Sequence, residues 1–553
     1  MKKMFLFLVC LQIMIHAHGQ PDQFSSIDSI FAEWSQPGSP GAALGIIRNG
    51  ELIYAKGYGF ANLEYDIPNT ANTVFRIGST SKQFTAACIV LLSEQGKLSL
   101  DDTLDKFFPD FPAYASSITI RHLLNHTSGI RDYLAISYLK GHGDDTFYTD
   151  EDVMKWLIRQ QDLNFLPGDE YLYSNSGYWL LGQIVKEVSG MNMADFARKE
   201  IFEPLGMTNT HFHNDHTMIV KNRASGYLPK REGGYQISMT TLDMIGDGGI
   251  FTTINDIKKW DDAFYDSDIF TRQFWSVMTE PGKLNNGKEL DYAAGLGIDT
   301  YRGLKLISHG GAFVGFRADF FRFPEQRLSI ALFANRGDAN PTAMCYQIAD
   351  IMLENEFRDL PEEPQQRKKT ATVKKISAQK LQQFAGDFWS EANSYSRKIY
   401  VRDDTLRYYR NENSENALVP IGPDEFKMIN VGASVLVKFE TSGDRSMVVT
   451  VNEEPPSRFE RYQPRSYSVS ELTDFEGTYY SEELDVQYVL RLENESLMLY
   501  INDNKISPLD AVMSEMFSND QYGTFLFSRE GDGSVGSFRL AAGRVKNLLF
   551  VKR

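Results

Sequence analysis

The last third of the chain contains one apolar pattern twice. Seven positions recur at a constant offset of 91 residues, and a shared offset over seven positions is hard to obtain by chance. The pairs are Leu381 and Leu472, Phe384 and Phe475, Gly386 and Gly477, Phe388 and Tyr479, Ile399 and Leu490, Val401 and Leu492, and Leu406 and Leu497. Both copies alternate apolar and polar residues between turn signals such as Gly531-Asp532-Gly533. This pattern predicts antiparallel sheets that curl into small barrels, either one for each copy or one built from both.

The residues before this repeat mix strand-like and helical segments. Strand-like runs are predicted at 42–47, 52–57 and 61–65, helices at 81–94, 120–124, 151–160 and 177–188, further strands at 304–309, 316–322 and 328–334, and a closing helix at 342–355. Strands at both ends of a helical middle predict an α+β domain whose antiparallel sheet is assembled from distant parts of the chain.

Composition suggests how the chain is divided. Lys2 and Lys3, the apolar run 4–15 and the small residues of Ala17-His18-Gly19 predict a cleavable export signal at 1–19, and therefore a periplasmic or secreted protein. A Pro-, Glu- and Lys-rich stretch predicts a linker at 361–377. The expected units are then a main domain at 20–360 and two barrel-like repeats at 378–466 and 467–553.

The charge and the metal-binding residue types exclude some classes of partner. The formal net charge of −16 argues against nucleic acid or an anionic membrane as the main partner, and no stretch after the signal is apolar enough for stable membrane insertion. His211, His213 and His216 cluster in a Thr/Asn/Asp-rich loop, which we interpret as a solvated loop, so no metal site is predicted.

The strongest local signal is the run Phe75-Arg76-Ile77-Gly78-Ser79-Thr80-Ser81-Lys82. Ser79 and Lys82 are three residues apart at the predicted start of a helix, so their side chains share one face. A serine hydroxyl needs a base to become a nucleophile, and a desolvated lysine can serve as that base. We therefore take Ser79 as the candidate nucleophile and Lys82 as its activating partner.

Two later motifs supply the remaining candidate residues. Tyr173-Ser174-Asn175 precedes a predicted helix, and Tyr173 is a second candidate base because a nearby lysine favours loss of the phenol proton. His309-Gly310-Gly311-Ala312 lies on a predicted strand, where glycines let a substrate backbone approach. The N–H groups of Ala312 and Ser79 could together form an oxyanion hole.

Taken in this order, the three motifs resemble those of the serine β-lactamase and penicillin-binding protein superfamily, over roughly the first two-thirds of the chain. The resemblance is strongest toward class C β-lactamases, D-aminopeptidases and related esterases. It implies a β-lactamase-like antiparallel sheet with a helical domain, followed here by the barrel-like C-terminal region. Some D-aminopeptidases carry lipocalin-like barrels after the hydrolase domain, and a barrel loop can restrict the mouth of the active site.

The resemblance implies that Ser79 attacks an amide or ester carbonyl while Lys82 and Tyr173 handle its proton. Asn175 would orient Lys82 or the substrate amide, and 309–312 would bind the substrate. No cofactor is expected, because backbone N–H groups and Lys82 can handle the developing charge. His126, in a stretch similar to the superfamily's, is interpreted as a structural hydrogen-bonding residue.

The third motif departs from the usual pattern. β-Lactamases and carboxypeptidases usually carry lysine and then serine or threonine before the glycine, whereas this chain has His309 and Gly310. The clamp for a substrate carboxylate is therefore weakened, with Arg317 as a candidate substitute. This departure favours D-aminopeptidases and esterases over efficient β-lactamases.

The leading hypothesis is an exported serine hydrolase that acts on a small peptide, ester or β-lactam-like substrate through an acylated Ser79, in the manner of a D-aminopeptidase. The alternatives are a D,D-carboxypeptidase or β-lactamase, a penicillin-binding sensor that is acylated without turnover, and a ligand-binding barrel protein with a relic hydrolase domain. The sequence leaves open the substrate, its stereochemistry, the base in each step and the oligomeric state.

Overall fold

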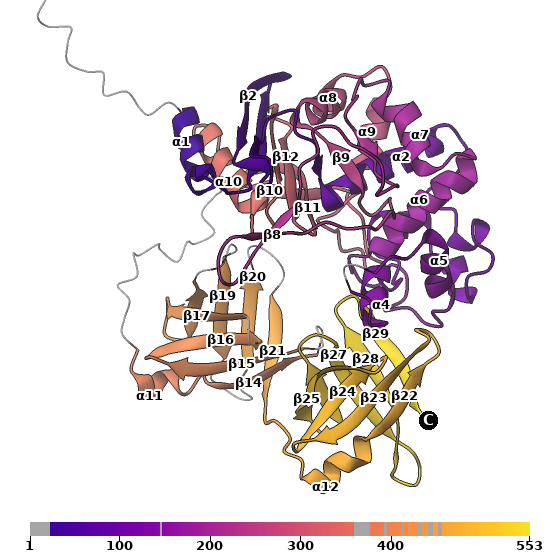
Figure 1. Ribbon diagram of the computed structural model, residues 1–553, viewed down its shortest axis with the longest axis vertical. Helices are drawn as coiled ribbons and strands as arrows, with labels where there is room; N and C mark the ends of the chain where they lie inside the picture. The colour runs from indigo at the N-terminus through magenta and orange to yellow at the C-terminus, as the bar shows by residue number, and fades with distance from the viewer. Residues whose placement is uncertain are drawn as a thin grey trace, which may run out of the picture.

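The computed structural model describes residues 23–143, 146–358, 376–391, 395–411, 414–429, 431, 434–440, 446–451 and 456–553 (Figure 1). The predicted export signal at 1–19 and residues 361–375 of the predicted linker lie outside the described residues. Within the described ranges, no helix combines the length and the apolar character needed to cross a bilayer.

A six-stranded antiparallel sheet forms the centre of the first domain. Its order is β10 (Gly297–Tyr301), β11 (Leu304–Phe313), β12 (Phe316–Phe323), β13 (Leu328–Ala334), β1 (Ala42–Arg48) and β2 (Glu51–Tyr58). β1 pairs with β2 on one side and with β13 on the other, so Ala43 lies opposite Phe333. The prediction of a sheet assembled from both ends of an α+β domain is confirmed.

Both faces of this sheet are covered, which explains why β1 and β13 are almost continuously apolar. Alternate residues of β1 point to opposite faces. Ala42 and Leu44 pack toward α1 (Gln23–Ile30) and α10 (Pro341–Met352), whereas Ala43 packs toward the larger helical region. Figure 1 shows α1 and α10 on one side of the sheet and α2, α8 and α9 on the other.

The helical region is built around α2 (Lys82–Glu94), in which every residue from 82 to 92 is buried. The other helices are α3 (Ile120–Leu124), α4 (Tyr133–Leu139), α5 (Asp150–Ile158), α6 (Asn175–Ser189), α7 (Met193–Ala197), α8 (Ile254–Tyr265) and α9 (Arg272–Met278). α6 begins two residues before the predicted start because the Ser174 side chain accepts a hydrogen bond from the N–H of Gly177 at 3.3 Å and caps the helix.

Short strands complete the first domain. They are β3 (Phe60–Asn62), β4 (Ile67–Pro68), β5 (Phe75–Arg76), β6 (His211–Phe212), β7 (Tyr227–Pro229), β8 (Tyr235–Ile237) and β9 (Ile250–Thr252). The strand predicted at 61–65 was too long. Oδ1 of Asn62 accepts hydrogen bonds from the N–H groups of Glu64 and Tyr65, and this local turn ends β3.

Each copy of the repeat forms its own closed eight-stranded antiparallel barrel, which settles the question that the sequence left open. The first contains β14 (Gly386–Ser390), β15 (Tyr395–Arg402), β16 (Thr405–Asn411), β17 (Ser414–Pro420), β18 (Glu425–Met428), β19 (Val435–Glu440), β20 (Ser446–Val451) and β21 (Ser457–Tyr462), preceded by α11 (Ala378–Leu381). The second contains β22 (Gly477–Ser481), β23 (Val486–Glu493), β24 (Ser496–Ile501), β25 (Asn504–Met513), β26 (Met516–Asn519), β27 (Gly523–Arg529), β28 (Val535–Ala542) and β29 (Val545–Lys552), preceded by α12 (Val469–Leu472). Equivalent residues such as Phe384 and Phe475 are buried in both.

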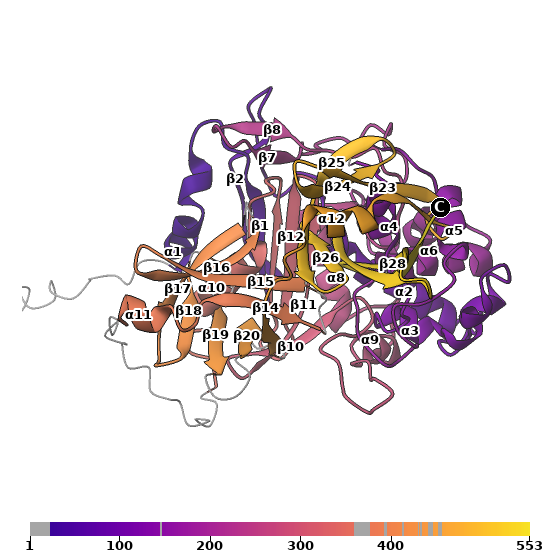
Figure 2. The ribbon, with the colours of Figure 1, turned by 90° about the horizontal axis from the view of Figure 1, so that it is seen from below.

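The two barrels lie side by side on the same side of the first domain (Figures 1 and 2). The first barrel has a separate apolar core, whereas the core of the second barrel is continuous with that of the first domain. The hydroxyl of Tyr488 donates to the carbonyl of Leu139 at 2.8 Å, and the rings of Tyr138 and Tyr522 stack at 5.0 Å. The second barrel therefore packs directly against α4 of the first domain and shares its apolar core.

A buried ion pair crosses this interface. The guanidinium of Arg131 is fully buried and contacts the carboxylate of Glu483, which is 9% exposed and also accepts the N–H of Gln161 at 2.8 Å. Arg131 further donates to the carbonyl of Lys546 at 3.1 Å.

Replacement of Glu483 by alanine is expected to destabilise the docked barrel by about 3–5 kcal/mol, because it leaves a buried guanidinium without its carboxylate. Chemical unfolding of the full chain measures this effect. The matched control is Glu482→Ala, because the neighbouring Glu482 is exposed and its loss is expected to change the unfolding free energy by less than about 0.5 kcal/mol. Equal unfolding midpoints for the two variants would show that the pair does not stabilise the interface.

Candidate active site

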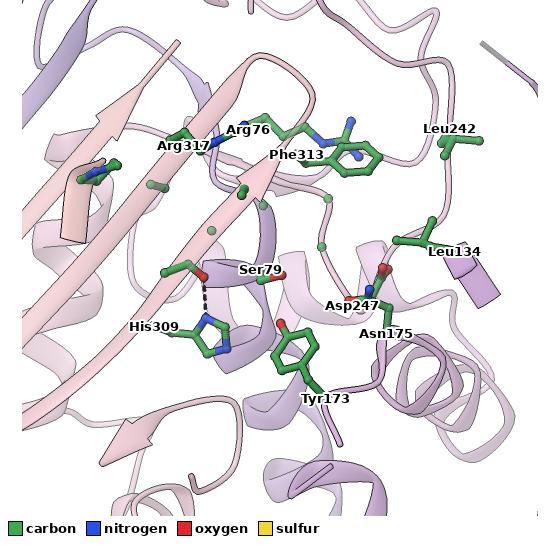
Figure 3. Close-up of a pocket in the computed structure, with 18 of the residues that line it drawn as sticks. Arg76, Ser79, Leu134, Tyr173, Asn175, Leu242, Asp247, His309, Phe313 and Arg317 are labelled. Atoms are coloured by element: carbon green, nitrogen blue, oxygen red, sulfur yellow. Dashed lines mark hydrogen bonds between the residues drawn. The ribbon is translucent and has the colours of Figure 1, made fainter. Parts of the chain in front are cut away.

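A cleft of about 540 Å³ contains seven of the eight residues that the sequence singled out. Its lining includes Ser79, Tyr173, Asn175, His309, Gly310, Gly311 and Ala312 (Figure 3). The eighth, Lys82, is fully buried at the base of the cleft behind Ser79. The structure thus brings together three segments that are far apart in the sequence.

Close contact between β11 and the short 3₁₀ turn Gly78–Ser81 places Ser79 in the cleft. A Cβ atom at Gly78 would lie 2.8 Å from the backbone nitrogen of Ala312, and one at Gly311 would lie 1.9 Å from the carbonyl oxygen of Ile77. Gly78 also has a φ of +52°, a conformation that favours glycine. The two glycines therefore allow the backbones of Ser79 and Ala312 to lie on the same wall of the cleft.

Lys82 is held by three acceptors. Its Nζ donates to Oγ of Ser79 at 3.2 Å, to Oδ1 of Asn175 at 2.9 Å, and to the carbonyl of Asp247. The same Nζ lies 4.8 Å from the centre of the Tyr173 ring. The three-residue spacing therefore does bring the amine to the serine hydroxyl, on the first turn of α2.

Burial shifts the pKa values of the two candidate bases, Lys82 and Tyr173, in opposite directions. Desolvation lowers the pKa of Lys82 to about 8, although the charges of Asp247 and Asp132 oppose this shift. Desolvation also raises the pKa of Tyr173 above its usual range, against the effects of Ser79 and Arg544. Burial therefore disfavours the charged form of the Tyr173 phenol, although the charge of Arg544 favours it.

Two aspartates that the sequence did not reveal support the lysine and the amide. Asp132 caps α4 and accepts the N–H of Asn175 at 2.8 Å, so it fixes the start of α6. Asp247 accepts the hydroxyl of Tyr133 at 3.0 Å, and burial raises the pKa of its carboxyl. Asp247 directly precedes Gly248 and Gly249, and all three residues line the cleft.

His309 occupies the place where a lysine is usual in this motif, but it is not a cation. Its Nε2 and the hydroxyl of Tyr292 are hydrogen-bonded at 2.9 Å, and its Nδ1 lies 2.6 Å from the carbonyl oxygen of Gly310. Desolvation, with a contribution from Lys82, lowers the pKa of His309 to about 4. A neutral imidazole gives no charge to hold a substrate carboxylate.

The contacts of two other histidines, His126 and His213, can be compared with what the sequence predicted. Nδ1 of His126 accepts the N–H of Ser174 at 3.1 Å and its ring lies 4.1 Å from that of Tyr173, which agrees with a structural role. His213 is buried and lies against His211, with 3.2 Å between their ring nitrogens. The interpretation of this segment as a solvated loop was therefore wrong for His213.

The second barrel contributes one residue to the cleft. Arg544, in the turn between β28 and β29, lines the cleft with its guanidinium 4.6 Å from the centre of the Tyr173 ring. It also lies 3.4 Å from Oδ2 of Asp132. No local motif marks this residue, because its role depends on how the barrel docks.

Comparisons with known proteins agree with this arrangement. The family described as Beta-lactamase matches residues 27–350. The chain is 30% identical to penicillin-binding protein 4* of Bacillus subtilis over 342 residues, which cover 59% of this chain and 74% of that protein. It is 31% identical to a D-aminopeptidase of Brucella anthropi over 325 residues, which cover 57% of this chain and 59% of the relative.

Solved structures show the same fold. A D-amino acid amidase from Ochrobactrum anthropi, solved with L-phenylalanine, is 26% identical with a TM-score of 0.52, covering 60% of this chain and 98% of that one. An octameric penicillin-binding protein homologue from Pyrococcus abyssi has a TM-score of 0.56 at 24% identity, covering 79% of this chain and all of that one. Since the family match spans more than half of the residues and includes all three motifs of the cleft, the chain belongs to the beta-lactamase family.

Proposed function

We propose that this protein is a serine hydrolase that cleaves an amide or ester bond of a small substrate through an acylated Ser79. The observation that carries the proposal is the contact between Nζ of Lys82 and Oγ of Ser79 at 3.2 Å, made by a buried amine whose pKa is about 8. Such an amine is neutral in a useful fraction of molecules near neutral pH, so it can accept the serine proton.

In the proposed acylation step, Oγ of Ser79 forms a bond to the substrate carbonyl carbon while its proton passes to Nζ of Lys82. The N–H groups of Ser79 and Ala312 would stabilise the oxyanion. The bond to the leaving group then breaks, and the leaving atom takes a proton through the Tyr173 hydroxyl. A water molecule releases the acyl group, and its proton returns through the same residues.

The relatives suggest the substrate class. D-Aminopeptidases and a D-amino acid amidase share this fold, so amides of small D-amino acids are the first candidates, with short esters beside them. A D,D-carboxypeptidase or β-lactamase is the second candidate because penicillin-binding protein 4* is also a relative. The neutral His309 favours the first class, because it removes a charge that would hold a carboxylate.

Three chromogenic substrates test the proposal: a D-alanine anilide, a short-chain aryl ester and a cephalosporin. Turnover that depends on Ser79 supports the hydrolase, and the preferred substrate distinguishes peptidase, esterase and β-lactamase. Acylation of Ser79 that is not followed by release would instead identify a sensor. Absence of any dependence on Ser79 would overturn the proposal and leave ligand binding by the barrels as the better hypothesis.

We also propose that the protein acts outside the cytoplasm, on the basis of the charged and apolar pattern of residues 1–19. The mature protein is then expected to begin at Gln20. Intact-mass measurement of the protein recovered from a secreting host tests this, and a mass that still includes residues 1–19 would contradict it.

A further inference from the structure

Arg76 is a buried cation for which the described part of the chain supplies no acceptor. It lies on β5 and is 6% exposed. Among the described residues, its side chain forms no hydrogen bond and no ion pair, and its Nε atom is buried without an acceptor. Buried guanidinium groups are normally paired, so an unpaired one indicates a partner that the protein itself does not provide.

The surroundings of Arg76 leave its N–H groups free. The guanidinium carbon lies 4.9 Å from the centre of the Phe313 ring and 5.8 Å from that of Phe251. Aromatic rings hold the cation in place but do not accept its hydrogen bonds in the plane. Burial lowers the pKa of Arg76 only to about 10, so the group stays charged at neutral pH.

The nearby carboxylates are already engaged. Asp247 accepts the hydroxyl of Tyr133 at 3.0 Å, and Asp243 is hydrogen-bonded to the ring of His216 at 2.9 Å. Both contribute to the electrostatic environment of Arg76, but neither forms a hydrogen bond with it. The positive charge of Arg76 is therefore offset only by carboxylates that do not form a hydrogen bond with it.

The other cations of the cleft differ from Arg76 in having partners. Arg317, which the sequence suggested as a carboxylate clamp, donates to the carbonyls of Val314 and Phe316 in its own hairpin at 2.9 and 2.7 Å. Arg544 contacts Asp132 and the Tyr173 ring. Among the described residues that line the cleft, Arg76 is thus the one arginine whose guanidinium forms no hydrogen bond and no ion pair.

The position of Arg76 indicates which part of a substrate it meets. In the view of Figure 3, Ser79 lies between Tyr173 on one side and the Arg76–Phe313 pair on the other. The leaving group must approach Tyr173 to take a proton, so it occupies the first side. The acyl group then extends along the end of β11 toward Phe313 and Arg76.

We infer that Arg76 binds a carboxylate carried by the acyl group of the substrate, so that the preferred substrates are monoesters or monoamides of dicarboxylic acids. The inference rests on the proposed function and narrows it. An ammonium group at the same place would be repelled, so amides of amino acids with a free amino group, named above as the first candidates, become poorer substrates than monoesters or monoamides of dicarboxylic acids. A carboxylate supplies the two acceptor oxygens that a guanidinium binds best.

The test compares two 4-nitrophenyl esters with five-carbon acyl groups, the glutaric acid monoester and the valerate. The wild-type ratio of kcat/KM is expected to favour the glutaryl ester at least tenfold. Arg76→Met is expected to lower this ratio at least tenfold, and Arg76→Lys to restore part of it. Arg272→Met, which changes an exposed arginine at the start of α9 that does not line the cleft, is the matched control and is expected to keep the wild-type ratio.

A third ester separates the two sides of the cleft. Valeryl 5-hydroxy-2-nitrobenzoate carries its carboxylate on the leaving group, and its hydrolysis is expected to show no preference that depends on Arg76. Such a preference would overturn the acyl-side assignment. Turnover of both 4-nitrophenyl esters at equal kcat/KM would overturn the inference while leaving the hydrolase intact, whereas no Ser79-dependent turnover of either ester would overturn the proposed function itself.

Inhibition of the wild-type protein gives a measurement that does not depend on the folding of a variant. Free glutarate is expected to compete with the valerate ester, and neutral glutaramide is expected to compete at least tenfold more weakly. Equal inhibition by the two compounds would contradict a cationic acyl subsite.

Discussion

Ser79→Ala is expected to lower kcat on every amide or ester that the wild-type protein hydrolyses by a factor on the order of 10⁴ or more. The hydroxyl oxygen of Ser79 is the atom that forms the acyl bond in the proposed mechanism. Initial rates on the D-alanine anilide, the aryl ester and the cephalosporin measure the effect. Mass spectrometry of the trapped intermediate should place the acyl group on the peptide that contains Ser79.

The matched control is Ser93→Ala, the same substitution near the other end of α2, where the side chain is half-buried and away from the cleft. This variant is expected to keep kcat within about twofold of the wild type, since surface changes of this kind have small effects. A Ser79→Ala protein that is folded and still retains a tenth of wild-type turnover would contradict covalent catalysis at this residue.

Lys82→Met is the second large effect. It removes the proposed base while keeping a side chain of similar length, and kcat/KM on a neutral ester is expected to fall on the order of 10³-fold. Because Lys82 is a fully buried amine, its replacement by an apolar residue is not expected to unfold the protein. Lys97→Met, which changes an exposed lysine beyond the end of α2, serves as the control and should leave kcat/KM unchanged.

The pH profile shows in which protonation state Lys82 works. The neutral amine is the base, and its fraction rises with pH through the lowered pKa of about 8. The wild-type kcat/KM is therefore expected to increase about tenfold per unit below that pH and to level off above it. Lys82→Met should lose this dependence. A wild-type rate that falls as pH rises through 8 would instead mean that the charged ammonium is the active form and that another group accepts the proton.

The parts of the site that could be predicted from the sequence are those fixed by local geometry. Ser79 and Lys82 lie three residues apart on one turn, and this spacing alone brings an amine to a hydroxyl. The glycines of 309–312 were predicted to let a substrate backbone approach, and the structure shows that Gly311 also allows a close approach to the carbonyl oxygen of Ile77 within the chain itself. The families of relatives followed from the order of these motifs.

The parts that could not be predicted depend on burial and on distant docking. Desolvation by burial raises the pKa of Tyr173, and the sequence gives no measure of how deeply this side chain is buried. Arg544 approaches Asp132 across 412 positions of the chain, and only the docked barrel brings them together. Arg76 was visible within its motif, but only the structure reveals that its guanidinium has no hydrogen-bond partner among the residues described.

The repeat was enough to predict barrels, but not how each sheet closes. A constant offset and alternating polarity were enough to predict barrels, because alternation is the period of a strand. Whether a sheet closes on itself depends on pairing between its first and last strands. In each copy those strands do pair, β14 with β21 and β22 with β29, and no pattern within a single strand specifies that contact.

The order of strands in the central sheet also governs when the protein can become active. β1 is completed by β13, and the N–H of Gly41 bonds to Oδ1 of Asn335, 294 residues further along. Contacts of such long range slow the folding of a domain. The wall that supports Ser79 comes from β11, so a chain that has folded only its early segments holds the nucleophile without the strand that faces it. We therefore expect reactivity toward acyl compounds to appear only after β11 has joined the sheet of the first domain.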